Sequence, residues 1–155
     1  MSEAFGAKLH KLDFAGRLKL REEERRELGG AVILACGFDH CVNVFSPEAW
    51  DAFVAGFDQL SPHDPTAHDL RRFLISTAER CEVDGQGRVR VPDLLLRWAG
   101  LGGGKLQAYL IRAGDRWELW EDESYHAFLQ QADGLKPLQA QYFGGRAAGE
   151  ESAAA

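Results

Sequence analysis

The feature that most constrains the fold of this chain is an internal repeat. The segment LDFAGRLKL at residues 12–20 recurs 71 positions later as VDGQGRVRV at residues 83–91. Both copies read apolar-Asp-x-x-Gly-Arg-apolar-basic-apolar. A second pair of similar segments, residues 45–53 and 120–128, follows at an offset of 75. Because similar segments at a near-constant spacing indicate duplication, the chain is predicted to contain two copies of one small unit.

The two copies divide the 155-residue chain into four predicted segments. A turn-rich Ser-Pro-His-Asp-Pro break at residue 61 leads into apolar residues at helical spacing over residues 66–80. After Phe143 the sequence contains no large apolar residue, which is typical of a disordered end. The predicted segments are a first unit (5–60), a helical connector (61–80), a second unit (81–132) and a C-terminal tail (133–155) whose end is disordered.

Each copy is predicted to mix short strands with short helices. The Asp-x-x-Gly-Arg core is typical of a tight turn between two strands, because Asp accepts hydrogen bonds from the backbone that follows it and Gly tolerates positive φ. A short helix, two more strands and a closing helix follow, with Ser46 and Asp122 as N-caps of the closing helices. The short helices are expected at 21–28 and 92–99, and the later strands at 31–36, 41–45, 106–111 and 116–120. The predicted fold class is α+β, with two pseudo-repeated β units and flanking short helices.

Alternation after each turn places basic residues on one strand face. In the sequences RLKL at 17–20 and RVRV at 88–91, every second side chain is basic and the others are apolar. This pattern predicts strands with one buried face and one basic face. The turn framework is predicted to consist of Asp13, Gly16, Asp84 and Gly87.

The formal net charge of −6 counts against nucleic-acid binding, because Lys and Arg must neutralise phosphates. The distribution of the charge counts for it. Residues 1–21 hold five basic and two acidic side chains, and residues 71–105 hold seven basic and four acidic ones. In contrast, residues 31–70 contain six acidic side chains and no Lys or Arg. Since the local field matters more to a docking surface than the total charge, an anionic partner remains compatible with the sequence.

Cysteine usage and hydropathy predict a cytoplasmic protein. The cysteines Cys36, Cys41 and Cys81 include no Cys-x-x-Cys pair, which favours reduced thiols buried as small apolar residues. No segment approaches the ~20 apolar residues of a membrane span, and the N-terminus has no apolar core of the signal-peptide kind. We therefore expect no membrane association. The aromatic residues expected in the core are Trp50, Trp117, Trp120, Tyr125 and Phe128.

Enzyme and metal interpretations find little support in the sequence. The dipeptides His63-Asp64 and His68-Asp69 suggest metal ligands of a small hydrolase, but an exposed loop is the simpler interpretation. The set Cys36, His40 and Cys41 lacks the further ligand that a tetrahedral zinc site needs. The segment GGGK at 102–105 is not a phosphate loop, because no Ser or Thr follows the lysine. The prediction is a protein without enzymatic activity, cofactor or metal.

Several motifs in a fixed order resemble the MraZ family. They are L-D-x-x-G-R-L at 12–18, R-R-F-L-x-S-x-A at 71–78, D-x-x-G-R-V-x-V-P at 84–92, A-G-L at 99–101 and W-E-L-W-E at 117–121. The matching order covers about residues 5–130, and it is far more specific than a single Asp-x-x-Gly-Arg turn.

The resemblance implies a fold, an assembly and a role. It implies two SpoVT-AbrB-type swapped-hairpin domains and a ring-shaped homo-oligomer, an octamer or a dodecamer. It also implies a cytoplasmic, nucleoid-associated repressor of the division and cell-wall gene cluster that binds repeated promoter sites in double-stranded DNA. In this family the Asp-x-x-Gly-Arg turns present basic side chains to DNA. The matching DNA-binding residues are Arg17 and Arg88, with Lys19, Arg90 and Lys8 as further candidates.

Departures from the family pattern leave two alternatives open. The family usually has a basic residue before the turn glycine and a proline after the first strand, whereas this chain has Ala15, Gln86 and Arg21 there. The first copy is therefore interpreted as degraded, which favours a protein of the same fold that has lost DNA binding and acts through protein contacts. At the level of residues, Arg17 and Arg88 could each pair with the aspartate of their own turn. Lys19 and Arg90 could form a solvated strand face, and Lys8 and Lys11 a solvated edge that discourages aggregation.

Overall fold

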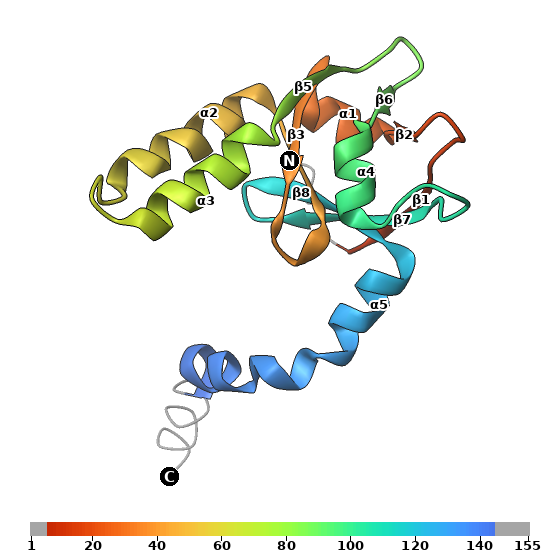
Figure 1. Ribbon diagram of the computed structural model, residues 1–155. Helices are drawn as coiled ribbons and strands as arrows, with labels where there is room; N and C mark the ends of the chain where they lie inside the picture. Colours follow the sequence, from red (N-terminus) through yellow and green to blue (C-terminus); the bar gives the residue numbers. More distant parts are fainter. Residues whose placement is uncertain (1–5, 145–155) are drawn as a thin grey trace. The chain divides into compact units, whose positions relative to one another are not determined.

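The computed structural model describes residues 6–144 and divides the chain into two compact units. The first, here called the sheet unit, is Met1–Asp122, and the second, the C-terminal unit, is Glu123–Ala155 (Figure 1). The predicted disordered end of the tail, from about residue 145, lies outside the described residues.

The sheet unit contains eight short strands among its described residues. They are β1 (Lys8–Lys11), β2 (Arg17–Lys19), β3 (Ala31–Cys36), β4 (Val42–Phe45), β5 (Glu79–Glu82), β6 (Arg88–Arg90), β7 (Gln107–Ala113) and β8 (Arg116–Glu121). The helices are α1 (Glu22–Leu28), α2 (Pro47–Ala55), α3 (Pro65–Ser76) and α4 (Asp93–Ala99), with 3₁₀ helices η1 (Phe38–His40) and η2 (Gly56–Gln59). The chain is thus a mixed α+β protein, as predicted.

The strands form two antiparallel sheets in which each half of the chain pairs with the other. The larger sheet has the order β1-β7-β8-β4-β3-β5, and the smaller one consists of β2 and β6. The opening strand of each half lies against a strand of the other half, because β1 pairs with β7 and β5 pairs with β3. If each strand is exchanged for its counterpart in the other half (β1 for β5, β2 for β6, β3 for β7 and β4 for β8), both strand orders read the same in reverse. The two copies of the internal repeat are therefore in a pseudo-twofold arrangement.

The core lies between the two sheets and the short helices. The apolar residues that alternate with the basic ones are buried, as predicted; they are Leu18, Leu20, Val89 and Val91. Helices α1 and α4 add Leu28, Leu95 and Ala99 to the same cluster. Helix α4 follows Pro92 and ends at Gly100, which adopts a left-handed conformation at φ 71°. Burial of one face of each strand therefore fixes which face carries the charges.

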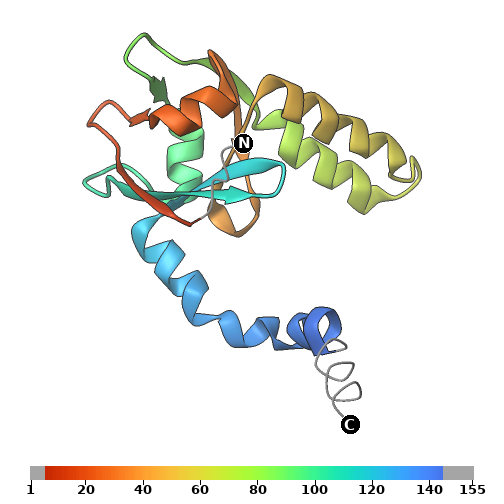
Figure 2. The same ribbon diagram turned by 180° about the vertical axis from the view of Figure 1, so that it is seen from behind.

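Helices α2 and α3 lie side by side in both views (Figures 1 and 2). Ser46 caps α2 as predicted, since its hydroxyl accepts a hydrogen bond from the Ala49 N–H at 3.1 Å. Asp64 caps α3 in the same way, through the Thr66 N–H at 2.9 Å. Helix α3 ends at Ser76 rather than near residue 80, because Glu79 already belongs to β5 and pairs there with Leu34.

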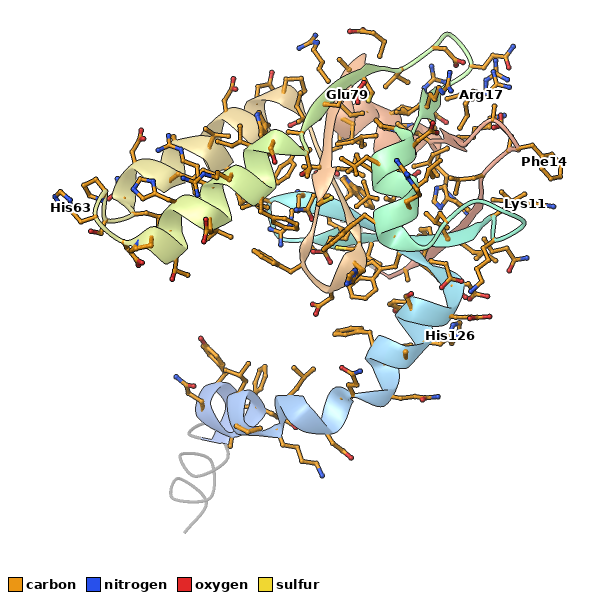
Figure 3. The ribbon with its side chains drawn as sticks, viewed as in Figure 1. Lys11, Phe14, Arg17, His63, Glu79 and His126 are labelled. Carbon is orange, nitrogen blue, oxygen red and sulfur yellow. The ribbon has the colours of Figure 1, made fainter. Side chains whose placement is uncertain are left out.

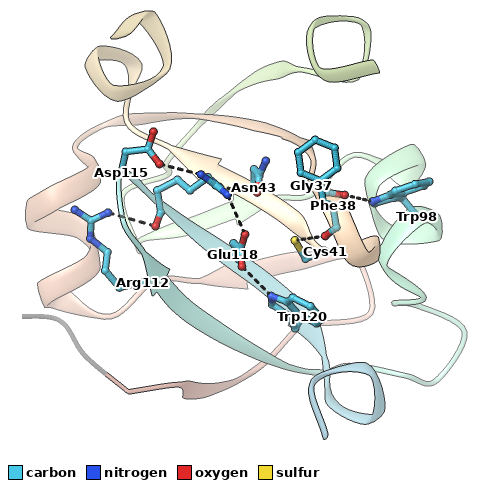
Figure 4. Close-up of polar contacts among 10 residues, drawn as sticks. Gly37, Phe38, Cys41, Asn43, Trp98, Arg112, Asp115, Glu118 and Trp120 are labelled. Carbon is cyan, nitrogen blue, oxygen red and sulfur yellow. Dashed lines mark hydrogen bonds and ion pairs between the residues drawn. The ribbon is translucent and has the colours of Figure 1, made fainter. Parts of the chain in front are cut away.

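A polar network joins β4 to β8 (Figure 4). Arg116 donates to the buried Asn43 side chain at 3.2 Å and to Glu118 at 3.4 Å, and Trp120 donates to the other Glu118 oxygen at 3.3 Å. In addition, Trp98 donates its indole N–H to the Gly37 carbonyl at 3.0 Å. The network satisfies polar groups that would otherwise be costly to bury.

Burial of the predicted core residues is uneven. Trp117 and Trp120 are buried as expected, whereas the expectation is wrong for Phe128, which is 39% exposed. All three cysteines are free thiols. Cys36 and Cys41 are buried, and partial burial together with the Glu79 and Glu82 carboxylates raises the pKa of the Cys81 thiol to about 11. These thiols are therefore poor nucleophiles at neutral pH.

The C-terminal unit is helical where it is described. Helix α5 (Asp122–Gln130) begins at the boundary of the two units, and η3 (Ala132–Leu135) and a helical segment over residues 136–144 follow. Across residues 6–144 we find no helix with the length and apolar character of a membrane span.

Candidate nucleic-acid interface

The first turn, residues 13–17, is held by one carboxylate. Asp13 accepts hydrogen bonds from the backbone N–H of Ala15 at 3.0 Å and of Arg17 at 2.9 Å. It also accepts a bond from the Arg17 Nε at 2.7 Å. Gly16 sits at φ 78°, a left-handed conformation that costs other residues roughly 1 to 2 kcal/mol. A short polar side chain followed by glycine therefore closes this turn.

The second turn, residues 84–88, repeats this geometry. Asp84 accepts from the backbone N–H of Gln86 and of Arg88, both at 2.9 Å, and from the Arg88 Nε at 2.9 Å. Gly87 also sits at φ 78°. In both turns the backbone N–H of the arginine is the main cause that lowers the pKa of the aspartate, so both carboxylates are charged at neutral pH. The two turns are thus equivalent in their hydrogen bonding.

The strands that leave these turns form a two-stranded sheet, here called the basic ribbon (β2 and β6). Its antiparallel register places Arg17 opposite Arg90 and Lys19 opposite Arg88. Because side chains in register share a face, four cations lie on one face while Leu18 and Val89 are buried on the other. The two turns lie at opposite ends of the ribbon, roughly 7 Å apart along a three-residue strand.

The charges on the basic ribbon are only half neutralised. Arg17 and Arg88 each form an ion pair with the aspartate of their own turn through Nε, as one of the alternatives from the sequence supposed. Their side chains remain 38% and 31% exposed, and their Nη groups make no other hydrogen bond in the described part of the chain. Lys19 and Arg90 are exposed and form no ion pair there. Because like charges directly opposite each other destabilise a sheet, this face favours an anionic partner.

Lys8 lies apart from the other candidates. It is the first residue of β1, at the edge of the larger sheet, where it pairs with Leu110. Asp13 opens the first turn five residues later, so Lys8 is at the end of the strand that points away from the turn. The structure therefore brings Arg17, Lys19, Arg88 and Arg90 together on one face, without Lys8.

Three further basic residues lie beside the ribbon, and the sequence did not single them out as DNA-binding candidates. Lys11, Arg21 and Arg25 line an open hollow of about 750 Å³ together with Lys19 and Gln86. A Cβ on Gly87 would come within 2.8 Å of the Arg25 side chain, so this arginine packs against the second turn. Leu96, which lies 71 residues after Arg25, packs against Gly16 in the same way, so the two positions correspond in the repeat.

The departure from the family pattern at position 21 has a structural reason. The Arg21 backbone N–H donates to the Glu24 carboxylate at 2.7 Å, a bond that proline could not make. Glu24 is fully buried, and its Oε1 also lies 2.9 Å from the Nε2 of His10. The arginine side chain is directed back to the Leu9 carbonyl at 3.0 Å.

The tips of the two turns differ. Phe14 at the first tip is 95% exposed, whereas Gly85 takes the same position in the second turn. Lys11, Phe14 and Arg17 project from the same end of the sheet unit (Figure 3). The first turn therefore presents an aromatic ring beside its arginine, and the second presents backbone.

The His and Asp residues considered as metal ligands are exposed or are engaged in local contacts. Asp64 caps α3, and the His68 Nε2 lies 2.6 Å from the Pro62 carbonyl oxygen. His63 and Asp69 are exposed, and Asp69 pairs with Arg72 at 2.7 Å. Among the residues that the structure describes, no three His, Cys, Asp or Glu side chains are grouped as metal ligands would be.

Comparison with known proteins places the chain in one family. The model of the MraZ protein family, described as antitoxin-like, matches residues 4–73 and again residues 74–141. A protein of Lactiplantibacillus plantarum named transcriptional regulator MraZ is 33% identical over 124 residues, which cover 80% of this chain and 86% of the relative. Proteins of the same name from Alkaliphilus oremlandii (33% over 119 residues, 77% and 81% covered) and Dictyoglomus thermophilum (30% over 133 residues, 86% and 89% covered) are also similar. Two successive matches to one model agree with the duplicated arrangement, and the chain belongs to the MraZ family.

Proposed function

We propose that this protein is a transcriptional regulator that binds double-stranded DNA through the basic ribbon and its two flanking turns. The observation that carries the proposal is the register of β2 and β6, which places Arg17, Lys19, Arg88 and Arg90 on one face. Phosphate neutralisation by Lys and Arg supplies the sequence-independent affinity for DNA, and the arginine fork suits phosphate and guanine. The name of the relatives, transcriptional regulator MraZ, supports the same role.

Within this proposal, the arginines are the DNA contacts and the aspartates position them. The ion pair through Nε holds each guanidinium in one orientation and leaves both Nη groups for a partner. Such pre-orientation lowers the side-chain entropy that binding would otherwise cost. Lys19 and Arg90 would then contact phosphates between the two turns, whereas Lys8 would contribute only at a distance.

The proposed action is repression of the division and cell-wall gene cluster by occupancy of repeated promoter sites. We further propose that the pairing of β1 with β7 and of β5 with β3 is the swapped-hairpin arrangement of SpoVT-AbrB-type domains. A ring-shaped homo-oligomer would engage several DNA repeats at once, so that weak single contacts add up to useful avidity. Exposed apolar side chains in the C-terminal unit, among them Leu135, Leu138 and Phe143, support association with further copies.

The test is DNA binding across a salt series with variants that remove only the proposed contacts. Arg17→Gln/Arg88→Gln keeps a donor for each turn aspartate but removes both charges, so the turns stay closed. Arg71→Gln/Arg72→Gln on helix α3 is the matched control, since it removes the same charge from an exposed surface. We expect wild type and control to bind DNA from the region upstream of the gene, with affinity that falls as salt rises, and the ribbon variant to lose specific binding.

A second candidate function is a protein-interaction role without DNA binding. It is favoured by the 95% exposed Phe14 at the tip of a turn that has Ala15 where the family has a basic residue. Absence of sequence-preferring DNA binding by the intact wild-type oligomer at low salt would support this second function and contradict the first.

A further inference from the structure

The pseudo-twofold arrangement produces two equivalent hollows on the sheet unit. The first lies beside β1, β2 and α1, and the second beside β5, β6 and the start of α4. Residues of the second hollow follow those of the first by 71 positions, so that Lys11 corresponds to Glu82 and Arg21 to Pro92. Both hollows are open, with volumes of about 750 and 400 Å³.

The two hollows carry opposite charges although they occupy corresponding places in the two halves. Four cationic side chains and one carboxylate line the first hollow; they are Lys11, Lys19, Arg21, Arg25 and Glu22. Two cations and three carboxylates line the second; they are Arg80, Arg90, Glu79, Glu82 and Asp93. Duplication alone would give both hollows the same charge, so the basic character of the first hollow is a feature of this copy.

The cations of the first hollow are not consumed by internal ion pairs. Over the described residues, none of Lys11, Lys19, Arg21 and Arg25 pairs with a carboxylate. The single lining carboxylate, Glu22, pairs with Arg26 at 2.8 Å. The Glu24 carboxylate is buried, and its Oε1 atom is engaged by His10 and the Arg21 N–H. In the second hollow, by contrast, Arg80 lies 3.5 Å from Glu82.

The first hollow is continuous with the basic ribbon. Lys19 belongs to both, because it lies opposite Arg88 in the ribbon and also lines the hollow. Gln86 of the second turn is a lining residue, and Arg25 packs against Gly87 of that turn. An anion that reaches the second turn therefore meets Arg25 and Lys11 as it extends into the hollow.

From this placement we propose that the first hollow is a phosphate-binding site, and that the second hollow is not. Several lysine and arginine side chains that form no ion pair can surround a phosphate, and an arginine can donate two hydrogen bonds to the same phosphate. With the proposed function as its basis, the phosphate belongs to the backbone of the DNA that lies on the basic ribbon. The chain then docks asymmetrically, with an added backbone contact at the second turn and none at the first.

The experiment compares salt dependence in two charge-matched variants. Lys11→Gln/Arg25→Leu empties the first hollow of two cations, and leucine at position 25 reproduces the packing of Leu96 against the other turn glycine. Arg80→Gln/Arg97→Gln removes two exposed cations that do not line the first hollow. Binding to the upstream DNA and to an unrelated duplex is measured by fluorescence anisotropy between 50 and 200 mM salt.

The expected result is a smaller salt effect in the hollow variant alone. For each phosphate contact, the affinity for DNA falls roughly 3-fold when the salt concentration rises fourfold. A variant that has lost one contact should therefore lose less affinity than the wild type over this series, by about that factor. Because backbone contacts carry no sequence information, the loss should be similar on both duplexes. The control should follow the wild type.

A second arm identifies the source of the phosphate. Inorganic pyrophosphate is titrated by calorimetry into wild type and hollow variant without DNA. If the wild type does not bind DNA but binds pyrophosphate, and the hollow variant does not bind pyrophosphate, the phosphate site is supported with a free phosphate as its ligand. The same result contradicts the proposed function. If wild type binds DNA and the hollow variant keeps its full salt effect and any pyrophosphate binding, the phosphate site is refuted while the function stands. A changed oligomer size in the hollow variant, with DNA binding intact, would instead assign the hollow to a second copy.

Discussion

At the scale of single residues, the two turn aspartates determine most of the local geometry. Asp13 and Asp84 each accept two backbone N–H bonds and one guanidinium bond, which lowers the pKa of both carboxyls. The Asp-x-x-Gly-Arg spacing predicts this turn well, because all partners lie within five residues of one another. The same spacing cannot show which additional cations approach from elsewhere, and so Arg25 at the second turn was missed.

These carboxylates predict a defined pH dependence of stability. A folded pKa below the unfolded value near 3.8 gives stability that is present above that value and lost as the pH falls through the folded pKa. Urea unfolding of wild type and Asp13→Asn/Asp84→Asn should therefore differ most at pH 7, with the difference shrinking below about pH 4. Asp58→Asn/Asp69→Asn on the surface is the matched control. An equal difference between wild type and the turn variant at pH 7 and pH 3 would count against the role given to the turn carboxylates.

At the scale of elements, the second turn depends on its second glycine, Gly87, rather than on its first, Gly85. Gly87 has φ 78° and faces Arg25, whereas Gly85 has an ordinary φ and no atom within 4 Å of an added Cβ. Gly87→Ala should lower the free energy of unfolding by about 1 to 2 kcal/mol, and Gly85→Ala should change it by less than about 0.5 kcal/mol. Chemical denaturation of both variants measures the difference, and equal losses of stability would contradict the special role given to Gly87.

The elements themselves follow from the sequence more closely than their pairing does. Alternation of apolar and basic residues and the Ser-Pro cap are local signals, and the elements they predict are present. The pairing of β1 with β7 is set by shared burial across the two halves, which leaves no mark in either strand alone. For the same reason the sequence predicts two strands that each have a basic face, but it does not predict that β2 and β6 pair to form one continuous basic face.

At the scale of the whole molecule, the exchange of strands makes each half depend on the other. Residues 1–62 alone would leave β1 without β7 and β3 without β5. Expressed separately, residues 1–62 and 63–155 should each lack cooperative unfolding, and coexpression should restore it, since unpaired edges leave apolar faces exposed. Circular dichroism with thermal unfolding tests this. Cooperative unfolding of residues 1–62 on their own would contradict the interdependence of the halves.

The pairing of β1 with β7 also sets an order of events during synthesis. Lys8 finds its partner Leu110 only after about 100 further residues have been added. At ribosomal rates of about 5 to 20 residues per second, the opening strand waits roughly 5 to 20 seconds with its edge unpaired. During that interval an adjacent nascent chain on the same messenger can offer an equivalent strand. Until β7 has been synthesised, the edge of the opening strand is thus open to such intermolecular pairing.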